Sequence, residues 1–77
     1  MNKPSIGRIV LVSADPERNN GADEAPAVIT RVFGPDMINV RVLLDGNDVD
    51  WMTSVELHDA KPQGDDAQPC AWWPPRV

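Results

Sequence analysis

Three arginines are the first residues in this sequence whose type and position could bind a ligand. Arg8, Arg31 and Arg41 each lie within a stretch of strand composition, so each is predicted to project from a β-strand. A guanidinium group offers N–H donors in a fixed plane and binds phosphate or carboxylate groups with two parallel hydrogen bonds. If the fold brings the three side chains to one face, they form a candidate site for an anionic ligand.

The segment Trp72-Trp73-Pro74-Pro75-Arg76 is the second candidate binding site. Proline favours a stiff, extended path, and each indole buries on the order of 150–250 Å² when it is covered. We expect these residues to form a strap that packs across the barrel of their own chain. Two alternatives are a contact with another subunit or partner, and a free peptide that a partner protein binds.

The other polar residues lack the spacing of a catalytic or metal-binding motif. His58 is the only histidine, and no nucleophile stands near it in a typical catalytic arrangement. Asp45, Asp48 and Asp50 surround a turn but lack the glycine and the distant glutamate of an EF-hand loop. The single Cys70 excludes a disulfide within the chain. We therefore predict a protein that is not an enzyme and that holds no cofactor and no metal.

Charge and hydropathy restrict the class of partner. Twelve Asp and Glu residues against seven Lys and Arg residues give a formal net charge of −5. This charge disfavours binding to the phosphate backbone of nucleic acids. The sequence contains no apolar run of about 18 residues that could span a bilayer, and its start lacks the pattern of a secretory signal. We expect a cytoplasmic protein without a membrane partner.

Four stretches have the composition of β-strands. Residues 6–12 and 27–33 are rich in β-branched side chains, and residues 38–44 carry apolar side chains at alternate positions. The stretch 49–55 also alternates, and the turn cluster 45–48 joins it to the preceding stretch in a predicted hairpin. No helical apolar spacing is present, so we expect no helix longer than about one turn.

These strands predict an all-β fold. Four to five short antiparallel strands in a strongly bent sheet form a small SH3-like open barrel, with an extended Trp/Pro-rich tail at its carboxyl end. We expect residues 1–58 to form the barrel domain. Residues 59–77 are expected to form a polar linker and a strap that packs on the barrel or on a neighbouring subunit.

Four stretches of the sequence resemble a family of short proteins encoded by bacteriophages and prophage-bearing bacteria. They are Lys3-Pro4-Ser5-Ile6-Gly7-Arg8-Ile9-Val10, Ala27-Val28-Ile29-Thr30-Arg31-Val32, Ile38-Asn39-Val40-Arg41-Val42 running into Asp45-Gly46, and Trp73-Pro74-Pro75-Arg76-Val77. The family commonly ends in Trp-His-Trp-Pro, where this chain has Ala71, Trp72 and Trp73. The resemblance implies a phage or prophage context and a small β-rich fold. It implies no assigned activity and no catalytic residue.

Three functional hypotheses follow. The first is a non-enzymatic accessory protein, in the cytoplasm of the host cell, that binds a host or phage protein through a barrel edge, the acidic loops or the Trp tail. The second is a homo-oligomer that sequesters an anionic nucleotide, with Arg8, Arg31, Arg41 or Arg76 on the phosphates and a tryptophan stacked on the base. The third is a minor structural component of the virion.

Overall fold

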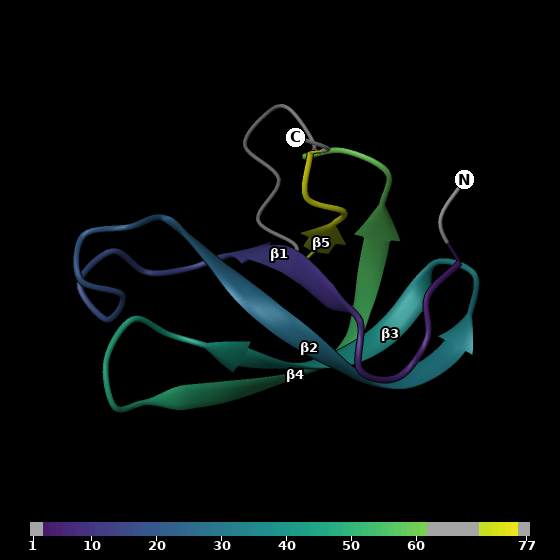
Figure 1. The fold of residues 1–77 in the computed structure, drawn as a ribbon, viewed down its shortest axis with the longest axis horizontal. Helices are drawn as coiled ribbons and strands as arrows, with labels where there is room; N and C mark the ends of the chain where they lie inside the picture. Colours follow the sequence, from purple (N-terminus) through teal and green to yellow (C-terminus); the bar gives the residue numbers. More distant parts are fainter. Residues whose placement is uncertain (1–2, 62–69, 76–77) are drawn as a thin grey trace.

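The computed structural model describes residues 3–61 and 70–75 and places five β-strands, and no helix, in these two ranges. The strands are β1 (Ile9–Ser13), β2 (Glu24–Gly34), β3 (Met37–Leu43), β4 (Val49–His58) and β5 (Cys70–Trp72). They form a closed barrel in which each strand pairs with its neighbour in the chain and β5 pairs with β1 (Figure 1). The prediction of an all-β, small SH3-like barrel is therefore confirmed.

The last strand is where the barrel differs from the predicted one. The sequence predicts an open barrel of antiparallel strands, whereas β5 lies between β1 and β4 and closes the sheet. It pairs antiparallel with β1, where Leu11 is opposite Trp72, and parallel with β4, where Leu57 is opposite Ala71. A parallel pair needs a longer connection than a hairpin, and residues 59–69 separate β4 from β5 in the sequence. Residues 70–72 contain no proline, so each has an N–H group for the ladder.

The core fills the inside of the barrel. Alternate residues of every strand contribute to it, and all five strands are represented. Its buried members are Val10, Val12, Ala25, Ala27, Ile29, Ile38, Val40, Val42, Leu44, Val55, Leu57, Ala71 and Trp73. These side chains are small or branched except for Trp73. The Trp73 indole is therefore the largest apolar group of this cluster.

Asn19 ties the loop between β1 and β2 to the hairpin between β3 and β4. Its side chain is 2 % exposed, and its Nδ2 donates to the carbonyl oxygens of Ala22 (3.0 Å) and Glu24 (2.8 Å). Its Oδ1 accepts the N–H of Asp45 at 2.7 Å. Because the side-chain amide of Asn19 both donates and accepts hydrogen bonds, one buried side chain holds together the two loops at this end of the barrel.

A β-bulge in β4 changes which of its side chains point into the barrel. Ile38 is opposite Val55 but Val40 is opposite Met52, so β4 has one residue more than β3 between these pairs. Ser54, in the bulge, has a φ of 55°. Unbroken alternation would place position 51 on the same face as Val55. Instead Val55 is fully buried and Trp51 is 56 % exposed.

Asn39 holds this bulge in place. It is a buried residue of β3, and its Oδ1 accepts the N–H of Ser54 at 2.8 Å and the hydroxyl of Thr53 at 3.0 Å. These bonds satisfy the N–H that the bulge removes from the regular ladder.

Residues 3–61 and 70–75 contain no helix that could span a membrane.

Candidate functional site

The two terminal tryptophans are buried within their own chain. Trp72 is 3 % exposed and Trp73 is 6 % exposed. Trp72 lies opposite Leu11 of β1, with the Lys61 ammonium 5.5 Å from the centre of its ring, whereas Trp73 belongs to the core cluster. Pro74 and Pro75 follow as exposed residues. The last member of the predicted tail site, Arg76, lies outside the described residues.

The three arginines of the predicted anion site each lie beside a different aromatic residue. The guanidinium of Arg8 is 5.0 Å from the centre of the Trp73 ring, and that of Arg31 is 5.2 Å from the centre of the Phe33 ring. Such distances are typical of cation–π contacts. Arg41 points outward from β3 and is the cross-strand neighbour of Trp51.

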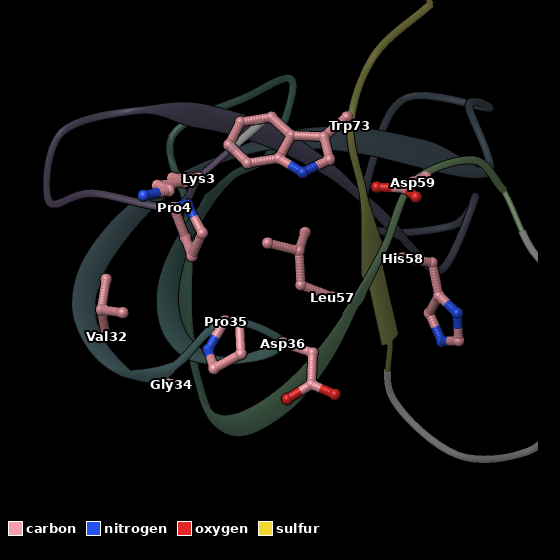
Figure 2. A pocket seen from close by; sticks show the side chains of 10 residues that line it. All are labelled: Lys3, Pro4, Val32, Gly34, Pro35, Asp36, Leu57, His58, Asp59 and Trp73. Atoms are coloured by element: carbon pink, nitrogen blue, oxygen red, sulfur yellow. The ribbon is translucent and has the colours of Figure 1, made fainter. Parts of the chain in front are cut away.

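A pocket lies at the end of the barrel where Trp73 is located. Its volume is about 620 Å³, within the range of roughly 300–1,000 Å³ that small ligands occupy. Four segments of the chain meet there: the amino-terminal stretch, the turn between β2 and β3, the end of β4, and the residue after β5. Its lining residues are Lys3, Pro4, Val32, Gly34, Pro35, Asp36, Leu57, His58, Asp59 and Trp73 (Figure 2).

Backbone hydrogen bonds fix the walls of this pocket, which we call the end pocket. Leu57 N–H donates to the carbonyl oxygen of Asp36 at 2.8 Å, and Trp73 N–H donates to that of His58 at 3.2 Å. Gly7 N–H donates to Ile29 at 2.8 Å and anchors the amino-terminal stretch on β2. Gly7 has a φ of 96°, a conformation that glycine adopts without the steric cost that other residues have. The pocket is therefore formed before any ligand arrives.

The end pocket combines apolar walls with a few polar groups. Figure 2 shows the indole of Trp73 and the side chain of Leu57 facing the same cavity, with the ring nitrogen on the edge toward it. Within residues 3–61 and 70–75 we find no acceptor for the indole N–H, and no buried side-chain N or O atom there lacks a partner. The N–H is therefore accessible, on the side where the cavity lies.

Charged side chains stand at the rim of the end pocket. Asp36 and Asp59 carry carboxylates and Lys3 carries an ammonium group. The ring of His58 points away from the cavity (Figure 2), and its Nε2 lies 2.8 Å from Oε1 of Glu56. Carboxylates thus outnumber fully charged cations among the lining residues. The charges of the lining residues therefore favour a ligand with a positive charge at the rim, whereas Arg8, which lies against the Trp73 ring, is not one of the lining residues.

A second feature is an apolar surface on the outside of β1 to β4. Pairing places Ile9 opposite Val28, Val28 opposite Arg41, and Arg41 opposite Trp51, so these four residues form one row across four strands. In the next rows Leu11 is opposite Pro26 and Leu43 is opposite Val49. We call this surface the outer face: Ile9, Leu11, Pro26, Val28, Arg41, Leu43, Val49 and Trp51.

The outer face exposes large apolar side chains. Val49 is 52 % exposed, Trp51 56 %, Ile9 44 % and Leu43 39 %. The hairpin loop that follows Leu43 and precedes Val49 carries exposed carboxylates, among them Asp45 and Asp48. Among the described residues, no three His, Cys, Asp or Glu side chains are arranged to hold a metal ion.

Several residues that make these two features are not among the predicted site residues. Trp51 belongs to an alternating pattern, and nothing in that pattern shows the bulge that turns it outward. Asp36 and Asp59 are single polar residues in different turns, and only the closed barrel brings them to one rim. Gly7 is the one residue whose place in the sequence pointed to the end pocket. It lies between Ile6 and Arg8 and interrupts a stretch of strand composition although no other turn residue stands beside it.

Comparisons with known proteins do not add a relative. No family model, no curated protein sequence and no solved structure matches this chain.

Proposed function

We propose that the protein is a non-enzymatic accessory protein of bacteriophage or prophage type that acts by binding a host or phage protein. The observation that supports this most is the outer face, where four large apolar side chains stay between 39 % and 56 % exposed. Contiguous apolar patches on a protein surface commonly mark protein interaction sites. Tryptophan and arginine are among the residue types that contribute most to such interfaces. Trp51 and Arg41 are cross-strand neighbours on this face.

The charges around the outer face favour a basic partner over a second copy of the chain. The chain carries a formal net charge of −5, and two copies that meet face to face bring these charges together. Asp45 and Asp48 stand next to the Leu43–Val49 pair and add negative potential at one end of the face. A partner with an apolar centre and Lys or Arg residues at its rim complements this surface.

The experiment is affinity capture from infected or lysogenic cells, followed by binding measurements with the captured protein. The variant Trp51→Ser removes the central anchor, and we expect at least a tenfold loss of affinity. The control is Phe33→Ser, which removes another exposed aromatic ring that lies outside the outer face. Asp48→Asn is expected to slow association and to reduce its salt dependence. Equal affinity of the wild type and Trp51→Ser would exclude the outer face as the binding surface.

Two other measurements separate this proposal from its alternatives. A rise in melting temperature with one member of a nucleotide panel would support a nucleotide-sequestering protein instead. Mass spectrometry of purified particles would detect the chain if it is a structural component of the virion. The protein-binding proposal predicts no rise for any nucleotide and no chain in the particles.

A further inference from the structure

The end pocket is separate from the outer face and has chemistry of its own. Its walls come from Trp73, Leu57, Val32, Pro4 and Pro35, which offer an apolar group a place away from water. Backbone hydrogen bonds between its segments hold these walls in place, as described above. A ligand therefore loses little affinity to ordering of the protein.

Two polar features of the pocket define what an occupant must carry. The accessible indole N–H of Trp73 faces the cavity (Figure 2) and requires a hydrogen-bond acceptor such as a carbonyl oxygen. Asp36 and Asp59 at the rim require a positive charge. Among the lining residues a phosphate group would meet two carboxylates and one ammonium group, that of Lys3, so an anionic ligand fits less well than a cationic one. The Arg8 guanidinium lies 5.0 Å from the centre of the Trp73 ring but does not line the cavity.

We propose that the end pocket binds an extended peptide segment in which an apolar residue is followed or preceded closely by Lys or Arg. The apolar side chain packs between Trp73 and Leu57, a backbone carbonyl accepts the indole N–H, and the basic side chain pairs with Asp36 or Asp59. An extended backbone supplies carbonyl groups between the two side chains, so one short peptide meets all three requirements. This site does not depend on the outer face.

The experiment is a selection of displayed random heptapeptides against the full chain, followed by affinity measurements with the enriched peptides made synthetically. We expect the enriched sequences to share an apolar residue near a Lys or Arg. The double variant Asp36→Asn/Asp59→Asn is expected to weaken their binding about two- to fivefold. The charge-matched control Glu17→Gln/Asp23→Asn removes two carboxylates at the opposite end of the barrel and is expected to leave affinity unchanged.

Thermal melting of each variant checks that it is folded, and Trp51→Ser tells the two sites apart. Peptides that bind the end pocket keep their affinity for Trp51→Ser, whereas the partner of the proposed function loses it. The proposal is overturned if the enriched peptides lack a basic residue, if no sequence is enriched, or if Asp36→Asn/Asp59→Asn binds them as tightly as the wild type. Dependence of the peptides on Trp51 would overturn it as well.

Discussion

Trp73 and Trp51 lie in opposite environments, because the first is buried and the second is exposed. Trp73 lies near the carboxyl end, where chains are usually frayed, yet it is 6 % exposed and part of the core. Trp51 lies inside a long strand of alternating residues, yet it is 56 % exposed. Topology decides both cases, because β5 closes the barrel beside Trp73 and the bulge in β4 turns Trp51 outward.

The difference in exposure gives the two tryptophans different roles, Trp73 in the stability of the fold and Trp51 in contact with a partner. A buried indole contributes to the free energy of folding, since it removes a large apolar surface from water. An exposed indole contributes little to folding and is available to a partner. Substitutions at the two positions should therefore have effects of very different size on unfolding.

The largest effect is expected for Trp73→Ala. Loss of a buried aromatic side chain usually lowers the free energy of unfolding by about 3–5 kcal/mol, which is the whole stability of many domains of this size. The matched control, Trp51→Ala, is expected to cost less than about 1 kcal/mol. Urea unfolding followed by circular dichroism measures both. Similar losses for the two variants would show that the comparison is wrong.

The second effect concerns Asn39, which holds the bulge that follows Trp51 in β4. Asn39→Ala removes the acceptor for Ser54 N–H and for the Thr53 hydroxyl, and we expect a loss of about 1–3 kcal/mol. Asn20→Ala is the control, because its side chain is exposed and donates a single bond to Asp45 at 3.1 Å. Urea midpoints give both values. A smaller loss of unfolding free energy for Asn39→Ala than for Asn20→Ala would contradict the role of Asn39 in holding the bulge.

A smaller change in the opposite direction is expected for Ser54→Gly. A residue other than glycine at positive φ costs roughly 1–2 kcal/mol, and glycine loses roughly 0.5–1 kcal/mol through its greater freedom in the unfolded chain. The net expectation is a gain of about 0.5 kcal/mol, seen as a higher melting temperature. Ser13→Gly, at an exposed strand position without positive φ, should lower it.

The smallest effect concerns Lys61, whose ammonium lies over Trp72 and pairs with Glu24. The hydrogen bond to Glu24 raises the pKa of Lys61 above its ordinary value. Its contribution to stability is therefore complete below the unfolded pKa of about 10.4 and is lost as pH rises through the folded pKa. The difference in melting temperature between the wild type and Lys61→Gln should be small near neutral pH and should vanish at high pH. A difference that grows with pH would contradict this.

The sequence predicts the strands of this fold well because the signal is local. Alternation along residues 38–44 and the turn cluster 45–48 identify the β3–β4 hairpin, and β-branched residues identify β1 and β2. β5 pairs with β1 and β4, which are distant from it in the sequence, so no spacing of residues in the sequence predicts these pairings. The bulge depends on Asn39 of another strand, and the end pocket depends on four segments that meet only when the barrel is closed.

The pairing of β5 with β1 has a consequence for how the molecule opens. In the described part of the chain two residue pairs join these strands, Leu11 with Trp72 and Val12 with Ala71, whereas β2 and β3 share a much longer ladder. We therefore expect sub-global opening to cost the least free energy at this short seam. Backbone amides along the seam should exchange with deuterium sooner than those between β2 and β3. Trp73, which follows β5 directly, lines the end pocket, so a bound peptide is expected to slow exchange along the seam.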